Sequence, residues 1–92
     1  MPDDRGVFVG NKPFMNYVTG VVMQFTRGAS EVTIKARGKF ISRAVDVAEV
    51  ATKRFLEGQA QVNDIRINSE EFVNKEGKNV RVSSIEIALG RK

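Results

Sequence analysis

The 92-residue sequence contains no cysteine, no histidine and no tryptophan. Without cysteine the chain can form no disulfide, no thiolate nucleophile and no cysteine-ligated zinc site. Without histidine it lacks the usual imidazole base, so a Ser-His-Asp triad is excluded. No apolar run approaches the roughly 20 residues of a membrane-spanning helix, and the acidic start at residues 1–5 has no apolar segment behind it. We therefore expect a cytoplasmic protein with no signal peptide and no membrane partner.

Length and charge indicate a single small domain with an anionic partner. Domains usually contain roughly 100–150 residues, and a chain of 92 residues has room for one modest core. Lysine and arginine number 15 against 11 aspartate and glutamate, and the formal net charge of +4 weakly favours polyanions. We expect a disordered leader over residues 1–6 and one domain over residues 7–92.

Hydrophobic periodicity predicts the element order βαβαββ. In chain order, the expected elements are a strand (7–9), a helix (13–27), a strand (32–36), a helix (40–57) and two strands (62–73 and 80–89) joined by a turn (74–79). A right-handed crossover makes the first two strands parallel, while the closing hairpin is antiparallel. The predicted fold class is α/β, more specifically an α+β two-layer sandwich: a mixed four-stranded sheet with two helices on one face.

The last expected strand contains a change of phase. Val80 and Val82 lie on one face, whereas the apolar residues at 85, 87 and 89 fall on the other. An extra residue in one strand would bring both groups to the same face, so we expect a β-bulge near Ser83 and Ser84.

Two expected strand-to-helix junctions carry a glycine followed closely by a lysine: Gly10-Asn11-Lys12 and Gly38-Lys39. Helix N-termini present free N–H groups and the positive end of the helix dipole, so each junction is a candidate phosphate site. The alternative is that the glycines only allow tight turns. A Walker phosphate loop is excluded, because its Gly-Lys-Ser/Thr signature is missing.

The second junction is the more basic one. Its four cations, with no acid between them, fall within nine residues: Lys35, Arg37, Lys39 and Arg43. The first two share the polar face of the expected strand, and the last two are four residues apart on the expected helix. Like charges at this helical spacing repel by about 0.2–0.5 kcal/mol, which an anionic ligand would offset. The alternative is a solvated basic face.

The expected hairpin is the third cationic element. A two-stranded arm with basic residues can follow a nucleic-acid groove. Its three cations are Lys75, Lys78 and Arg81, and they are diluted by Glu70, Glu71 and Glu76. The alternative is an exposed polar hairpin without a ligand.

Enzymatic sites find little support in the sequence. Asp46 and Glu49 have a spacing that could chelate a metal. We expect them instead to form ion pairs, Asp46 with Arg43 and Glu49 with Lys53 or Arg54. Most of the six phenylalanines fall at core positions, so a platform for stacking single-stranded bases is also disfavoured. We expect no catalytic residue, no metal, no cofactor and no enzymatic activity.

Two segments stand out beside these patterns: VGNKPFMNYV at residues 9–18 and IKARGKFISRAVD at residues 34–46. They resemble the signature stretches of the Alba family, the small archaeal chromatin proteins. KRF at residues 53–55 and VSSIEI at residues 82–87 are similar to the family as well. The resemblance extends over nearly all of the chain after the leader, and it implies the βαβαββ fold that periodicity predicts independently.

The resemblance implies a homodimer that binds double-stranded DNA with little sequence preference, coats and compacts archaeal DNA in the nucleoid, and also binds RNA. The family pattern implies body contacts from Lys12, Arg37, Lys39 and Arg43, and hairpin contacts from Lys75, Lys78 and Arg81. Phe55 matches a family position at contacts between neighbouring dimers. The alternatives left open are a mainly RNA-binding protein (a ribonucleoprotein subunit or an RNA chaperone), a purely structural scaffold, and a heterodimer with a paralogue.

The first junction departs from the family pattern. Many family members have two lysines after the glycine, the first being a site of reversible acetylation, whereas this chain has Asn11 followed by Lys12. The resemblance therefore leaves Lys12 as the candidate acetylation site. We expect Asn11 to hydrogen-bond a phosphate or to cap the first helix.

Overall fold

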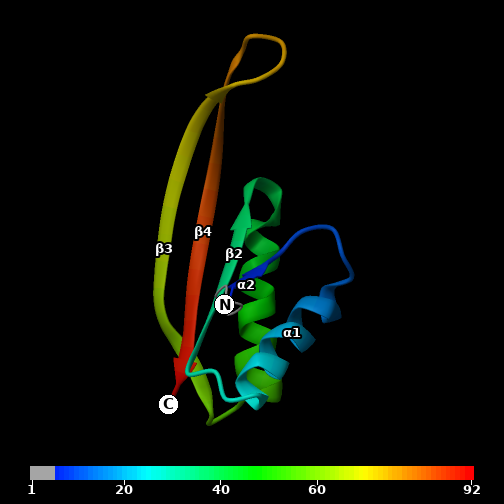
Figure 1. The fold of residues 1–92 in the computed structure, drawn as a ribbon, viewed down its shortest axis with the longest axis vertical. Helices are drawn as coiled ribbons and strands as arrows, with labels where there is room; N and C mark the ends of the chain where they lie inside the picture. The colour runs from blue at the N-terminus through cyan, green and yellow to red at the C-terminus, as the bar shows by residue number, and fades with distance from the viewer. Residues whose placement is uncertain (1–5) are drawn as a thin grey trace.

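The computed structural model describes residues 6–92 and has the predicted element order βαβαββ (Figure 1). Its elements are β1 (Gly6–Phe8), α1 (Phe14–Thr26), β2 (Glu31–Arg37), the 3₁₀ turn η1 (Gly38–Phe40), α2 (Ile41–Val50), the π-helical turn η2 (Ala51–Phe55), β3 (Ala60–Val73) and β4 (Asn79–Arg91). The leader expected at residues 1–6 lies outside the described residues, except for Gly6, which belongs to β1.

The four strands form one mixed sheet in the order β1-β2-β4-β3. β1 and β2 are parallel, whereas β4 is antiparallel to both of its neighbours. Both helices lie on the same side of the sheet (Figure 1). The predicted two-layer sandwich is therefore confirmed.

The first helix begins and ends where the sequence predicts. Pro13 precedes α1 with φ −54° and ψ 141°, a position that suits proline because no helical bond needs its missing N–H. Gly28, just past the end of the helix, has φ 103°, a left-handed conformation that favours glycine. One face of α1 is buried in the core: Tyr17, Val18, Val21 and Phe25.

The predicted second helix is present as helical turns from residue 38 to residue 55, but its hydrogen-bonding pattern changes along its length. The chain first forms the 3₁₀ turn η1, then α2, and then the wider turn η2. In this wide turn the N–H of Leu56 donates to the carbonyl of Ala51, five residues back, at 2.9 Å. The hydroxyl of Thr52 donates to the carbonyl of Ala48 at 2.8 Å, and such a back-bond competes with regular helical bonding. Hydrophobic spacing alone does not reveal these changes of pitch.

The core lies between the helices and the two central strands. In the register of β2 with β4, three apolar pairs face the helices, and each of their residues is at most 9% exposed: Val32 with Leu89, Ile34 with Ile87, and Ala36 with Ile85. From the helices, α1 supplies its buried face and α2 supplies Ala44, Val47 and Ala48.

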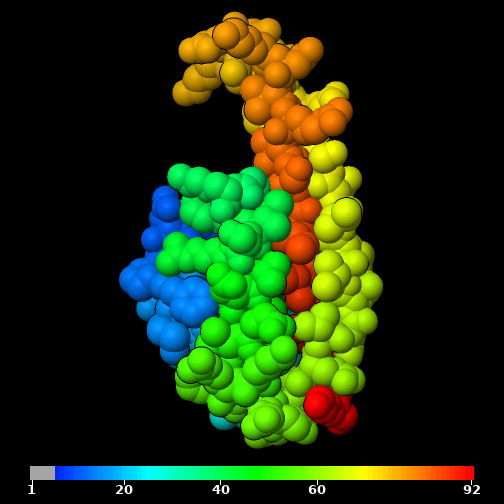
Figure 2. Space-filling model, turned by 180° about the vertical axis from the view of Figure 1, so that it is seen from behind, coloured from blue at the N-terminus to red at the C-terminus, as the bar shows by residue number. Residues whose placement is uncertain are grey.

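The helices leave the edge strand β3 uncovered. Ile65 and Ile67 lie on the helix-facing side of the sheet, opposite Ile87 and Ile85, yet they are 55% and 81% exposed. Figure 2 shows atoms of β4 between α2 and β3, so a groove separates the helix layer from this strand. We call it the α2/β3 groove. Its lining includes Ile41, Ile67 and Ile85 towards one end, and Thr52, Ala60 and Val62 towards the other.

The bulge expected near Ser83 and Ser84 is wrong. β4 pairs without interruption there, and the irregularity lies in β3 between Val62 and Asp64. The change of phase in β4 needs no bulge, because its first two valines stand on the face away from the helices, where Val80 opposes Phe72. Next to the actual bulge, the side chain of Asn63 occupies the space that a Cβ on Gly90 would take, so a larger residue at position 90 would force Asn63 to move.

The β3–β4 hairpin extends beyond the rest of the protein (Figure 1). The pairing of β2 with β4 ends at Arg37 opposite Ser84, whereas β3 and β4 stay paired to the tip. Residues 69–83 therefore have strand partners only within the hairpin. We call these residues the arm, and the rest of the described chain the body.

The turn at the tip of the arm forms as predicted. The side chain of Asn74 accepts the N–H groups of Glu76 and Lys78 at 2.9 and 3.0 Å. Gly77 has φ 79°, which only glycine adopts without strain.

The packing predicts a clear contrast between two valine-to-alanine variants. Val32 is 0% exposed in the centre of the sheet, whereas Val73 is 63% exposed at the end of the arm. We expect Val32→Ala to lower the free energy of unfolding by about 2–3 kcal/mol, because it removes buried methyl groups and leaves a cavity. Val73→Ala should change it by less than about 0.5 kcal/mol. Urea-induced unfolding at one protein concentration measures both, and equal effects would contradict the described core.

Candidate nucleic-acid interface

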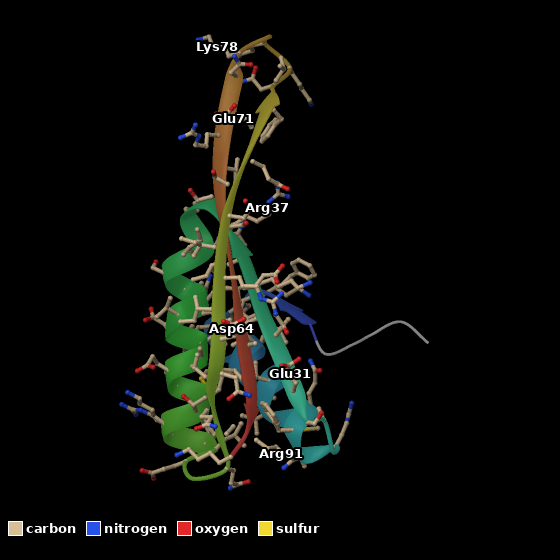
Figure 3. All side chains as sticks on the ribbon, turned by 90° about the vertical axis from the view of Figure 1, so that its left-hand side faces the viewer. Glu31, Arg37, Asp64, Glu71, Lys78 and Arg91 are labelled. Carbon is tan, nitrogen blue, oxygen red and sulfur yellow. The ribbon has the colours of Figure 1, made fainter. Side chains whose placement is uncertain are left out.

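The two basic junctions lie at the same end of the body. Because β1 and β2 are parallel neighbours, their carboxyl ends reach the same edge of the sheet. The loop after β1 carries Lys12 and the turn η1 after β2 carries Lys39, and both residues are exposed. The arm leaves the body at this end, with Arg37 near its base and Lys78 near its tip (Figure 3).

The loop at the first junction is tied to both helices. The phenol oxygen of Tyr17 on α1 accepts the N–H groups of Gly10 and Lys12, each at 2.9 Å. From α2, Arg43 Nη1 donates to the carbonyl of Gly10 at 2.9 Å, and its guanidinium lies 5.8 Å from the centre of the Tyr17 ring.

These contacts change the expected chemistry of the first junction. Two of its backbone N–H groups are already bonded to Tyr17 and cannot cradle a phosphate at the same time. The backbone of the loop is therefore less available, and the exposed side chain of Lys12 is the charged group that the loop offers to an anion. The expectation that Asn11 caps the first helix is wrong, because Pro13 occupies the cap position and no side chain caps it.

The four cations of the second junction lie on three different elements: β2, η1 and α2. Lys35 and Arg37 share the open face of the sheet as predicted, and Lys35 Nζ lies 5.4 Å from the centre of the Phe8 ring. Lys39 belongs to η1 and not to α2, so its predicted helical spacing from Arg43 is wrong. Three of the four, Arg37, Lys39 and Arg43, lie at the arm end of the body, while Lys35 lies farther back on β2.

Acids from the hairpin hold two of the predicted cations. Arg37 Nη2 lies 2.8 Å from Glu70 Oε1, and Arg81 Nη2 lies 2.7 Å from Glu71 Oε2. All four side chains are more than half exposed, so each pair is worth only about 0–1 kcal/mol. Phosphate oxygens can therefore replace the carboxylates at little cost.

The lysines of the arm are more available. Lys75 and Lys78 are exposed beside the tip and form no ion pair with any residue from 6 to 92. With Arg81 they are balanced by the three glutamates of the arm, so the arm as a whole carries no net charge. At the tip, Lys75 and Lys78 flank Glu76 and leave a net charge of +1, whereas Glu70, Glu71 and Arg81 give −1 nearer the base.

The alternative metal site has no support in the described part of the chain. Residues 6–92 contain no group of three or more aspartate or glutamate side chains placed to hold a metal ion. Glu49 pairs with Lys53 at 3.0 Å, as predicted. The predicted pair between Asp46 and Arg43 is wrong, since Arg43 turns to the carbonyl of Gly10.

Within residues 6–92, no helix has the length and apolar character that a membrane crossing requires.

Sequence reasoning missed two groups of exposed apolar residues. Three of the six phenylalanines are substantially exposed, Phe8 by 70%, Phe55 by 50% and Phe72 by 47%, so the expectation that most lie in the core is wrong. The position of Phe8 between two valines in a strand was a usable signal, because alternate residues face opposite sides. The second group consists of Ile65 and Ile67 beside the α2/β3 groove.

Comparison with known proteins identifies close relatives. A family model described as Alba matches residues 6–69. The DNA/RNA-binding protein Alba of Nanoarchaeum equitans is 61% identical over 87 residues, which cover 94% of this chain and 97% of that protein. The DNA/RNA-binding protein Alba of Methanocella arvoryzae is 56% identical over 91 residues, or 99% of this chain and 94% of that protein. The structure of Alba from Thermoplasma volcanium has a TM-score of 0.85 at 49% identity and covers 94% of this chain and 99% of that one.

Proposed function

Because the chain belongs to the Alba family, we propose that it binds double-stranded DNA with little sequence preference, coats and compacts the chromosome as a homodimer, and also binds RNA. The observation that carries this proposal is the convergence of both basic junctions at the base of an arm with a cationic tip. The name of the relatives, DNA/RNA-binding protein Alba, supports the binding of nucleic acid.

The proposed mechanism is neutralisation of phosphates with release of counterions. Lys12, Arg37 and Lys39 would meet the backbone of the duplex at the end of the body, and Lys75 and Lys78 would meet it farther along. The arm extends about 17 Å past the body, since five residues from Ser69 to Val73 rise roughly 3.4 Å each. This reach exceeds the roughly 12 Å width of a major groove, so one arm can follow a groove from the body.

Contacts of this kind position a protein without reading base sequence. Lysine is a flexible point charge, which suits phosphates at many registers. RNA offers the same phosphates, so the alternative of a mainly RNA-binding protein rests on the same residues. Competition between equal lengths of duplex DNA and structured RNA separates the two.

The α2/β3 groove supports the homodimer. Ile65 and Ile67 leave an apolar strip exposed on β3, and Val45 on α2 is 41% exposed near it. A second copy of the chain, related by a two-fold axis, would cover this strip with the same surface of its own. Dimerisation would also double the formal charge from +4 to +8.

We propose two further roles for exposed side chains. Phe55 ends η2 and is half exposed, which suits a contact between neighbouring dimers along DNA. Lys12 is exposed, so an acetylating enzyme could reach it, and acetylation would remove one of the proposed phosphate contacts. We propose location on the chromosome and no enzymatic activity.

The first test is the salt dependence of binding to duplex DNA. Lys12, Lys39, Lys75 and Lys78 form no ion pair with any residue from 6 to 92, which makes eight such cations in a dimer. Neutralising eight phosphates gives a slope of log affinity against log salt of about −7, or a loss of about 10⁴-fold between 50 and 200 mM salt. Lys12→Ala should make the slope less negative by about 2 and weaken all duplex sequences alike.

The matched control is Arg27→Ala, which removes one positive charge at the end of α1 away from the arm. It should leave the slope unchanged. A wild-type slope near zero, or equal effects of the two variants, would contradict the proposed contacts.

The ion pair at the base of the arm predicts a variant that binds more tightly. Glu70→Gln frees Arg37 for phosphate in both subunits of the dimer, so we expect duplex affinity to rise by about 2- to 30-fold, the equivalent of two exposed ion pairs at about 0.2–1 kcal/mol each. Glu31→Gln makes the same change of charge at the other end of β2 and should raise affinity less (Figure 3). A fluorescence titration measures both, and equal gains would show that only net charge matters.

The homodimer is tested by a variant with lysine at both positions 65 and 67. Sedimentation should find a dimer for the wild type and a monomer for Ile65→Lys with Ile67→Lys. Duplex affinity should fall although each subunit gains two positive charges. Phe55→Ala is the control: it should remain dimeric and lose cooperativity along DNA. A monomeric wild type, or a lysine variant that still dimerises, would contradict this interface.

A further inference from the structure

We propose that Tyr17 and Arg43 are positioning residues that hold the loop from Gly10 to Lys12 ready for a phosphate. This inference rests on the proposed function and adds to it a residue that carries no charge. Neither side chain needs to touch the nucleic acid for this role. Each acts through the backbone that carries Lys12.

Tyr17 fixes the loop on both sides of Asn11. Its oxygen accepts the N–H of Gly10 before that residue and the N–H of Lys12 after it, both at 2.9 Å. A hydroxyl oxygen has two acceptor positions, so these bonds use both. Tyr17 is itself 7% exposed within α1, and the packed helix therefore holds the bonding oxygen in place.

Arg43 adds a connection to the second helix. Its Nη1 donates to the carbonyl of Gly10 at 2.9 Å, and its guanidinium lies 5.8 Å from the centre of the Tyr17 ring. The side chain is half-buried and forms no ion pair with any residue from 6 to 92. The sequence analysis counted Arg43 among the phosphate contacts. In the structure, one of its N–H groups is bonded to the loop.

A held loop improves binding by lowering the cost of ordering. A flexible segment loses conformational freedom when it binds, and a segment already held in place loses less. The side chain of Lys12 remains exposed, so it can reach a phosphate while its backbone stays fixed. The competing explanation is that the two bonds only stabilise the fold, in which case they affect unfolding and not binding.

The test is a double-mutant cycle of Tyr17→Phe with Lys12→Ala, measured by duplex titration at several salt concentrations. Tyr17→Phe removes only the phenol oxygen and keeps the buried ring. We expect it to lower affinity roughly three- to tenfold. The salt slope should not change, because no cation is lost. In the Lys12→Ala background, Tyr17→Phe should lower affinity by less than about twofold, since the group it positions is gone.

Val32→Ala is the control for stability, because it weakens the core in a part of β2 away from the loop. Below its unfolding midpoint it should bind DNA like the wild type. If Tyr17→Phe does not fold, Arg43→Lys takes its place, since it keeps the charge and loses the geometry of the guanidinium. It too should lower affinity without changing the salt slope.

The outcomes separate this inference from the function on which it rests. Normal wild-type binding with unchanged affinity in Tyr17→Phe overturns the positioning role alone. An equal loss of affinity with and without Lys12 also overturns it, because the phenol would then act independently of that lysine. A wild type that shows no salt-dependent binding overturns the proposed function and this inference with it.

Discussion

The parallel pairing of β1 with β2 determines where the basic residues of this protein lie. Within residues 6–92, three residue pairs form this ladder, from Gly6 with Thr33 to Phe8 with Lys35. Because the two strands run in the same direction, the chain leaves both at the same edge of the sheet, and each exit carries a lysine. An antiparallel pair would send the junctions to opposite ends, and the same composition would then present no concentrated cationic end.

The surface built on this arrangement is only moderately positive, because glutamates lie beside its cations. Two arginines near the arm are already paired with glutamates in exposed contacts. Such pairs are weak, so an incoming phosphate can replace the carboxylate with little loss. In the proposed function, the hairpin acids would therefore compete with phosphate for the arginines and lower the affinity for DNA. This balance would suit the proposed coating of DNA, in which the protein must bind at many positions and also leave them.

Periodicity predicted the element order, the ends of α1 and the turn at Asn74, since each depends on a local rule about apolar spacing, proline, glycine or asparagine. Periodicity did not predict features that depend on tertiary contacts. The back-bond of Thr52 accompanies a widened turn in the second helix, and the bulge moved to Asn63 because Val80 and Val82 can occupy the uncovered face. For the interface, the sequence identified the candidate lysines but not the side chains that contact the loop carrying Lys12. Tyr17 and Arg43 are 26 residues apart in the chain, and no local pattern reveals that both hold the same loop.

The central claim is that the arm end of the body, together with the arm, forms one surface for duplex DNA. The most direct measurement is an NMR titration of the assigned protein with a short duplex. We expect the largest amide shifts in the loop at residues 10–12, in the turn at residues 38–40 and along the arm at residues 69–83. Shifts concentrated instead around Arg66 on the open sheet face, or around Arg27 and Arg54 at the other end, would contradict it.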